Sequence, residues 1–440
     1  MPDFPGKFQY FAPGGAIAQE GSCRVHFDAQ SLTLTPESGT AALAFDLGDL
    51  DSITAADWQL QLMLYTGRTL MLRQLGRSYD TVAHNLTDAF RNRIVQCMLL
   101  EDMEEISRFT GSIEWNVKSG PAEMRLYKSN LAVLPTAAPA FQWRLADIDD
   151  VNFDSAAYEI SLQSGPARLR VSRLAKRTEE FASKLREAIN TLSTQTAKAL
   201  HAMLPFLDPD QLQTCAGVLR EGRSAPLTKL AAIHKQIPTA LAANAIDKDL
   251  KPYYDQLIDL AAPGLAYVGF KLIRSDDSDD VFADDDTTDD TDDAPDADAT
   301  EPETLYWFLV PLAARRGEAT PANVVAWEAN SRGGRATYFF RITDAARANE
   351  LADPARAATL IDHSIQRLNF ALAMLNFRRR PIYLSDEELA RDPRFHRYAI
   401  AARRIPEVCE VRAAFLGRAL HTSPEAWQSQ ADSILVKAGT

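Results

Sequence analysis

The sequence lacks the features that mark secreted, membrane-spanning and zinc-binding proteins. Its 440 residues include four cysteines, none in a Cys-x-x-Cys pair, which predicts neither a disulfide framework nor a zinc site and favours a reducing compartment. No run approaches the ~18 consecutive apolar residues of a membrane-spanning helix. The first residues have neither the basic nor the apolar region of a signal peptide. We therefore expect a cytoplasmic protein.

Motifs of common enzyme classes are also missing. The sequence contains no GxSxG, HExxH, Walker A or GxGxxG pattern. A set of aspartates, with counterparts in both halves of a repeat described below, resembles a metal-binding cluster: Asp147, Asp149 and Asp150, and Asp49 and Asp51. They alternate with apolar residues, however, which predicts that they line the solvent face of a strand. We expect no metal, no cofactor and no catalytic residues.

Negative charge is concentrated in one segment. Residues 276–303 hold thirteen Asp and two Glu without Lys or Arg, whereas the whole chain has a net charge of −13. This composition predicts disorder. Strand-like runs at 265–273 and 305–310 flank the segment, so we expect it to be an insertion between two strands of one sheet. Two roles remain open: a solvating insertion, or a polyanion that binds a basic partner or a basic face of the same chain.

The N-terminal half of the sequence repeats itself at an offset of 98–100 residues. The matches are SLTLTP (31–36) with NLAVLP (130–135), FDLGDLDSI (45–53) with WRLADIDDV (143–151), and the helical positions Val82, Leu86, Ala89 and Phe90 with Phe181, Leu185, Ala188 and Ile189. The offset exceeds the roughly 20–50 residues of solenoid repeats. The repeat therefore predicts two whole domains.

Each copy combines short alternating runs, typical of antiparallel strands, with one closing amphipathic helix. The first copy predicts strands at 23–28, 31–36, 42–47, 50–55, 57–65 and 68–75, then a helix over 78–99. The second predicts strands at 113–118, 121–128, 130–135, 140–146, 148–154, 157–163 and 167–174, then a helix from about 177. We expect a small barrel or sandwich closed by its helix, with Leu86 and Leu185 in equivalent buried positions.

This order of elements resembles the pleckstrin-homology-like (PH-like) fold, in the tandem form found in bacterial proteins. The resemblance covers about residues 15–195 and implies PH-like domains at 1–104 and 105–196. Lipid-binding members of that family crowd basic residues around the first loop. Here only the separated Lys118 and Lys128 lie in early turns, so phosphoinositide binding is not expected. The resemblance implies a protein or peptide partner, bound beside the closing helix or at an open sheet edge.

Residues 197–440 predict helices followed by an α+β domain with a four-stranded antiparallel sheet, which makes the chain α+β as a whole. Asp208 and Ser385 begin capping boxes. Asp353 begins a long helix that ends at Arg378–Arg380. Its predicted core face consists of Leu360, Ile361, Ile365, Leu368, Leu372 and Leu375.

This C-terminal part is rich in arginine. Arg315, Arg316, Arg332, Arg335 and Arg341 lie on or beside predicted strands and form a candidate face for an anion or an acidic partner. The excess of Arg over Lys, with abundant Ala, is also typical of a GC-rich bacterial genome. The charge is far below the strongly basic footprint of a nucleic-acid-binding domain, so nucleic acid is not the expected partner.

Three functions follow from these patterns. The leading hypothesis is a non-enzymatic scaffold that binds a protein or peptide through tandem PH-like domains. The first alternative is an enzyme, or enzyme subunit, with a site around Trp327, Glu328, Asn330 and Arg335. The second is an acidic-tract binder of basic proteins or a nucleic-acid-associated protein, because tandem domains of this fold also accompany acidic tracts in eukaryotic histone chaperones.

The acidic segment generates a first prediction. Replacing residues 276–303 by a short Gly/Ser linker should leave the melting temperature unchanged or slightly raised, because the segment contributes fifteen like charges and little apolar area. Thermal melts at low and high salt are the measurement. A loss of stability confined to low salt would contradict the prediction and indicate that the segment docks on arginines of its own chain.

Overall fold

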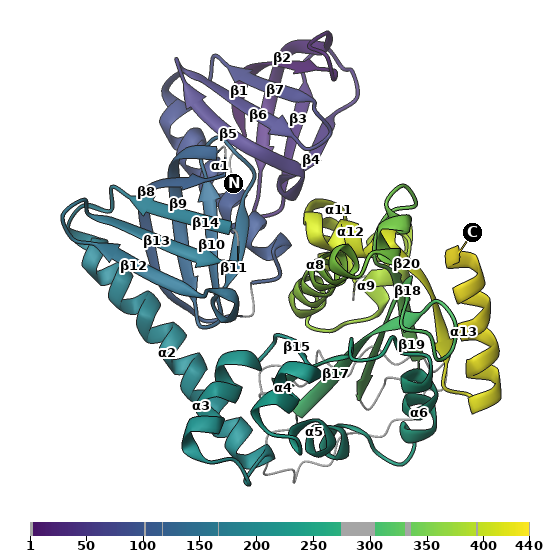
Figure 1. Ribbon diagram of the computed structural model, residues 1–440. Coiled ribbons are helices and arrows are strands. Elements are labelled where there is room, and N and C mark those ends of the chain that lie inside the picture. The colour runs from purple at the N-terminus through teal and green to yellow at the C-terminus, as the bar shows by residue number, and fades with distance from the viewer. Residues whose placement is uncertain are drawn as a thin grey trace, which may run out of the picture. The chain divides into compact units, whose positions relative to one another are not determined.

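The computed structural model describes residues 3–100, 103–116, 118–165, 167–273, 304–330, 336–392 and 395–439 (Figure 1). The chain forms two compact units. The first consists of Met1–Asn190 together with Asp392–Arg404, and the second of Thr191–Arg391 together with Ile405–Thr440. A short segment from late in the sequence therefore belongs to the N-terminal unit.

The first domain is a seven-stranded antiparallel sheet in the order β4-β3-β2-β1-β7-β6-β5, as described within residues 3–100. Its elements are β1 (Phe4–Phe11), β2 (Ile17–Phe27), β3 (Ser31–Pro36), β4 (Leu43–Asp46), the one-turn 3₁₀ helix η1 (Leu47–Asp49), β5 (Leu50–Ala56), β6 (Gln59–Leu64), β7 (Thr69–Arg73) and the closing helix α1 (Tyr79–Cys97). The sequence predicted six of these strands. It missed β1, where Pro5 and Gly6 interrupt the alternating pattern.

The second domain repeats this topology over its described residues, in the order β11-β10-β9-β8-β14-β13-β12. Its elements are β8 (Glu105–Trp115), β9 (Lys118–Tyr127), β10 (Asn130–Pro135), β11 (Phe141–Arg144), η3 (Leu145–Asp147), β12 (Asp150–Asp154), β13 (Glu159–Ser164), β14 (Ala167–Ser172) and α2 (Thr178–Met203). Leu86 in α1 and Leu185 in α2 are both fully buried. The predicted duplication and the equivalence of these two leucines are confirmed.

The two domains of the first unit share part of their core. Tyr127, Ala132 and Leu134 of the second sheet belong to the same buried apolar cluster as the first domain. Beside it, the buried Arg125 donates to Glu123 at 2.6 Å and to Asn92 of α1 at 3.0 Å. The end of α1 is therefore held on both sides, by its own sheet and by the next domain.

The second unit is built on an antiparallel sheet with six described strands in the order β15-β16-β17-β18-β19-β20. The strands are β15 (Ala225–Pro226), β16 (Tyr267–Leu272), β17 (Thr304–Ala313), β18 (Pro321–Asn330), β19 (Ala336–Arg341) and β20 (Phe415–Leu420). The predicted number of four was wrong. β15 has only two residues, and β20 lies between two helices, so neither carries a strand pattern of its own.

Helices cover both faces of this sheet. The helices of this unit are α3 (Pro209–Val218), α4 (Leu227–Ile233), α5 (Ile237–Ala245), α6 (Lys251–Asp259), α8 (Pro354–Met374), α9 (Arg380–Tyr383), α10 (Asp386–Arg391), α12 (Pro406–Ala414) and α13 (Pro424–Gly439), as far as the structure describes it. On one face, the Trp307 ring packs against Phe377 with 4.2 Å between ring centroids. On the other, Phe308 packs against Tyr254 of α6 at 4.8 Å.

The predicted helix starts in this unit are confirmed. Asp208 accepts from the Gln211 amide at 2.8 Å, and Ser385 and Glu388 cap each other reciprocally. All six predicted core positions of α8 are buried. However, α8 ends at Met374, before Arg378–Arg380, because Asn376 and Phe377 adopt left-handed backbone angles that terminate the helix.

The acidic segment connects two neighbouring strands, as predicted. β16 pairs with β17, and Leu272 lies opposite Thr304. Residues 276–303 themselves lie outside the described residues. The sheet is therefore continuous on both sides of the insertion point.

The shared fold of the two N-terminal domains generates a stability prediction. Leu86→Ala and Leu185→Ala should each lower the free energy of unfolding by about 2–5 kcal/mol, because each removes a buried side chain where the closing helix meets its sheet. Urea unfolding measures this loss. Met63→Ala is the matched control, since this side chain is 45% exposed and its removal should change stability by less than about 0.5 kcal/mol.

Candidate functional site: an acidic turn that holds a distant helix

The acidic turn, residues 46–51, connects β4 to β5 and is held in shape by one of its own carboxylates. The Asp46 side chain accepts a hydrogen bond from the Gly48 amide at 2.7 Å and caps η1. Leu47 points into the core and is fully buried. Leu50 is buried as well, whereas Asp49 at the end of η1 and Asp51 in β5 are only partly buried. The turn therefore presents two carboxylates on the surface of the first sheet.

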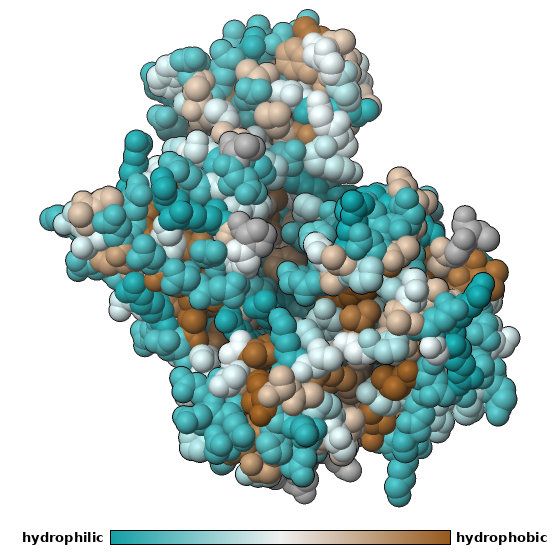
Figure 2. Space-filling model, in the orientation of Figure 1, coloured by the Kyte–Doolittle hydropathy of each residue, from teal (hydrophilic) through white to brown (hydrophobic). Residues whose placement is uncertain are grey.

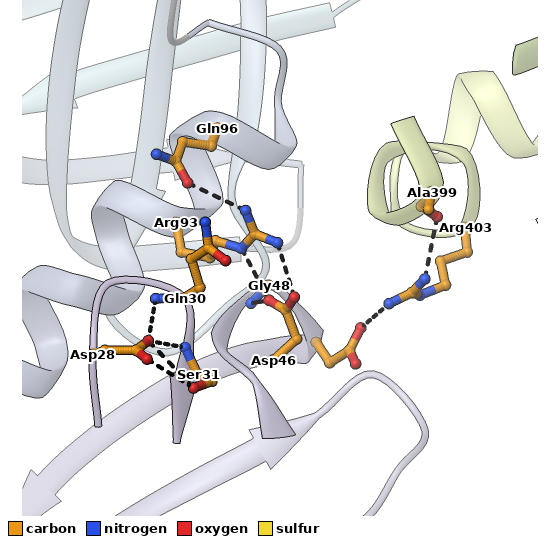
Figure 3. A network of polar contacts seen from close by, with 10 residues as sticks. Asp28, Gln30, Ser31, Asp46, Gly48, Arg93, Gln96, Ala399 and Arg403 are labelled. Carbon is orange, nitrogen blue, oxygen red and sulfur yellow. Dashed lines mark hydrogen bonds and ion pairs between the residues drawn. The ribbon is translucent and has the colours of Figure 1, made fainter. Parts of the chain in front are cut away.

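A buried arginine ties this turn to the closing helix. From α1, Arg93 Nε donates to Asp46 Oδ1 at 3.0 Å, and Arg93 Nη2 donates to Asp46 Oδ2 at 2.8 Å (Figure 3). Its Nη1 donates to Gln96 Oε1 at 3.2 Å. The Arg93 side chain is only 9% exposed. This two-point contact fixes both position and orientation of the turn.

The neighbouring β2–β3 turn supports the same structure. Asp28 Oδ1 accepts from the amides of Gln30 and Ser31 at 2.8 and 2.7 Å, which lowers the pKa of the Asp28 carboxyl below its ordinary value. The Gln30 carbonyl in turn accepts from the Leu47 amide at 2.8 Å. The first domain thus shapes its acidic turn with its own residues.

Helix α11 (His396–Arg404) lies against this turn within the first unit. Arg403 Nη2 donates to Asp49 Oδ1 at 2.6 Å. Arg404 Nη2 donates to Asp51 Oδ1 at 2.7 Å and to the Leu50 carbonyl at 3.2 Å. Figure 3 shows Arg403 extending out of α11.

The prediction that Asp49 and Asp51 simply line a solvent face was therefore wrong. They do face outward from the sheet, but their side chains are only 24% and 29% exposed because α11 covers them. Alternation in the sequence reports which face of a strand a residue occupies, not what lies on that face.

Small and apolar groups complete the contact. A Cβ on Gly48 would lie 2.6 Å from Cys97 Sγ and 2.9 Å from Ile400 Cδ1, so this close approach requires glycine. Burial raises the pKa of the Cys97 thiol to about 12, and it packs as a small neutral group. The Tyr65 ring lies 5.9 Å from the Arg403 guanidinium and 5.2 Å from that of Arg404, within cation–π range.

The second domain does not repeat this site. At the position of Asp46 it has Arg144, whose Nε pairs with Asp147 Oδ2 of the same turn at 3.1 Å. At the position of Gly48 it has Ala146, which carries the Cβ that the first domain lacks. In the second domain, Asp147 is thus paired with an arginine of its own turn, and the Ala146 side chain takes the place of the bare glycine backbone.

The arginines predicted as an anion-binding face lie in different places. Arg315 and Arg316 occupy the β17–β18 connection and Arg341 ends β19, whereas Arg332 and Arg335 lie outside the described residues. Arg316 Nη2 pairs with the carboxylate of the last residue of α6 at 2.6 Å. The Arg315 side chain is 84% exposed. An anion-binding role for these residues stays a prediction.

The residues of the enzyme alternative are enclosed in the second unit. Trp327 and Glu328 are each 1% exposed. Asn330 Oδ1 accepts from the Tyr306 amide at 2.7 Å, within the sheet. Arg335 lies outside the described residues. The three described side chains contribute to the sheet and its core, which argues against a substrate site there.

Glu328 belongs to a buried polar network. Its Oε2 accepts from the Thr337 hydroxyl and lies 3.1 Å from His421 Nε2. Trp427 Nε1 donates to Thr337 Oγ1 at 2.7 Å. The His421 ring stacks on Tyr253 with 4.2 Å between centroids. The network joins β18 and β19 to α13, so its geometry accounts for a structural role.

The surface offers no large apolar alternative on the face shown in Figure 2. Hydrophobic residues of the two N-terminal domains appear there as small separate patches. In the part of the chain that the structure describes, no three His, Cys, Asp or Glu residues gather as metal ligands would. Every described helix is too short or too polar to cross a lipid bilayer. The acidic turn, with the contacts that it makes to α11, is the candidate functional site.

Comparisons with known proteins give no family. No family model and no curated protein matches the chain. Among solved structures, the chain is similar to the pleckstrin homology domain of USP37 (18% identity over 21% of this chain and 98% of that chain, TM-score 0.18). It is also similar to the Spt16D–Pob3N heterodimer (19% identity over 36% of this chain and 84% of that chain, TM-score 0.14). Both TM-scores are far below 0.5, so neither match decides family or function.

The ion pairs between α11 and the turn generate a second stability prediction. Asp49→Asn, Arg403→Gln and the double variant should give a coupling free energy of about 0.5–3 kcal/mol, because the two groups are in direct contact and partly buried. Urea unfolding of the four proteins completes the cycle. Additive losses would show that Asp49 and Arg403 do not interact in solution.

Glu114 and Arg170 form the matched control pair. They are 3.1 Å apart across neighbouring strands, but their side chains are 61% and 41% exposed. Solvent screens such a pair, so its coupling should not exceed about 1 kcal/mol. If the control pair has a coupling free energy as large as that of Asp49 and Arg403, the contact with α11 stabilises the protein no more than an exposed surface pair does.

Proposed function

We propose that the protein is a non-enzymatic interaction protein, with tandem PH-like domains, whose first domain recognises an arginine-bearing helix of a protein partner. The acidic turn supplies the recognition surface. The groups that it offers are the carboxylates of Asp49 and Asp51, the Leu50 carbonyl, the Tyr65 ring and the backbone of Gly48. The partner is thus a protein segment rather than a lipid headgroup or a nucleic acid, both of which are anionic.

One observation carries this proposal: the turn already holds a helix of this chemistry. The arginine pair of α11 engages Asp49, Asp51 and the Leu50 carbonyl, while Ile400 packs over Gly48. Guanidinium groups form strong charge-assisted hydrogen bonds to carboxylates and stack on aromatic rings. These contacts support the proposal that the turn binds a helix with arginine and aliphatic side chains.

The PH-like assignment rests on the order of elements. Each N-terminal domain has seven described strands followed by one closing helix, in the same sheet order. The surface beside the closing helix is the one expected to bind a peptide in such a domain. α11 contacts α1 there, and its Arg403 pairs with Asp49 of η1. A helix in a groove is one of the recurring modes of peptide recognition.

Capture of partners by the full-length chain tests the function. The tagged protein and its Asp49→Arg/Asp51→Arg variant are used to recover proteins from extracts of the source cell, followed by quantitative mass spectrometry. Partners bound through the turn should fall at least about tenfold with the variant, because two attractive charges become repulsive. A Glu114→Arg variant, changed at an exposed carboxylate elsewhere, should retain them. Equal recovery by all three proteins would contradict the proposed role of the turn.

A further inference from the structure

We propose that α11 is a built-in, displaceable occupant of the acidic turn, which keeps the site closed until a partner helix of matching chemistry replaces it. This inference rests on the proposed function and adds its regulation and its ligand pattern. The pattern is an aliphatic residue followed at the third and fourth positions by arginines, as in Ile400-x-x-Arg403-Arg404. Positions i, i+3 and i+4 lie on one face of a helix, so one helix can present all three groups at once.

The receiving surface is formed without α11. The Arg93–Asp46 contact, the Asp46 cap on the Gly48 amide and the Gln30–Leu47 hydrogen bond all lie within the first domain. Removal of α11 leaves each of these bonds in place. A surface that keeps its shape when empty binds a new ligand without an ordering cost.

The resident helix binds the turn with moderate strength. Its two ion pairs keep side-chain exposures between 12% and 29%, so solvent screens them in part and reduces what each contributes. Arg403 Nε and Arg404 Nη1 are buried without a hydrogen-bond partner among the described residues. A buried donor that lacks an acceptor weakens an interface. The fit of α11 is thus good but incomplete, and a partner helix with fewer unsatisfied donors would bind better.

Covalent attachment compensates for this moderate strength at rest. α11 follows α10 and precedes α12 in the same chain, so it reaches the turn at a high effective concentration. A partner helix must therefore bind strongly enough to compete with this effective concentration of α11. Occupancy of the turn becomes a competition between one segment in the chain and one in the partner.

Peptide binding to the full-length protein tests the competition. The probe is a fluorescent peptide with the sequence of residues 395–406, followed by anisotropy. Three proteins are compared: wild type, Arg403→Glu/Arg404→Glu, in which α11 is repelled from the intact turn, and Asp49→Asn/Asp51→Asn. We expect the peptide to bind the α11 variant at least about tenfold more tightly than wild type, and the turn variant no better than a control peptide with both arginines replaced by glutamate.

The outcomes separate the two proposals. Equal peptide affinity for wild type and the α11 variant would overturn displacement while leaving recognition by the turn intact. Peptide binding to the α11 variant that survives the added Asp49→Asn/Asp51→Asn changes would contradict the proposed function itself. The milder Arg403→Gln/Arg404→Gln variant should give an intermediate gain, and absence of that gain in a folded protein also overturns displacement. If wild type forms a dimer that the Asp49→Asn/Asp51→Asn changes abolish, the occupant of the turn is α11 of a second copy. That result would contradict binding of a different protein at the turn.

Discussion

A buried guanidinium requires a partner, and the structure of the acidic turn follows from how the first domain meets this requirement. Arg93 extends from α1 to Asp46, where it forms two hydrogen bonds at 3.0 and 2.8 Å. Removing Asp46 would leave the Arg93 guanidinium, which is only 9% exposed, without this charged partner, and a desolvated charge without a partner is unfavourable. Asp46 is therefore bound to Arg93 of α1, and the other two carboxylates of the turn, Asp49 and Asp51, remain to bind α11. The inward ion pair shapes the turn, and the outward carboxylates recognise α11.

Duplication supplied two similar domains, and the difference between them locates the site. Both copies share the sheet order and the closing helix. In the second copy, Arg144 and Ala146 replace Asp46 and Gly48. The first change reverses the charge that shapes the turn. The second adds a Cβ at a position where, in the first copy, a Cβ would lie less than 3.0 Å from Cys97 and Ile400. One fold thus carries a helix-binding turn in one copy and a self-paired turn in the other.

The local parts of this structure could be predicted from the sequence, and the distant contact could not. Helical spacing predicted Leu86 and Leu185 as equivalent core residues, because burial on an amphipathic helix repeats every three to four positions. The pairing of Asp49 with Arg403 joins residues 354 positions apart, and no periodicity reports a contact between two separate elements. Arginine-rich composition pointed instead to five arginines of the C-terminal part. The substitution of Arg144 for Asp46 between the repeats was the available signal, since it marks where the two copies recognise different groups.

The central claim is that the acidic turn of the first domain holds α11 in solution, and backbone hydrogen exchange tests it most directly. Exchange of the amides of residues 398–404 is measured in wild type and in Asp49→Asn/Asp51→Asn, with α8 as the internal reference. The account predicts that exchange in α11 accelerates at least about tenfold in the variant, equivalent to about 1.4 kcal/mol of lost protection, while α8 is unchanged. Identical protection of α11 in both proteins would contradict the account.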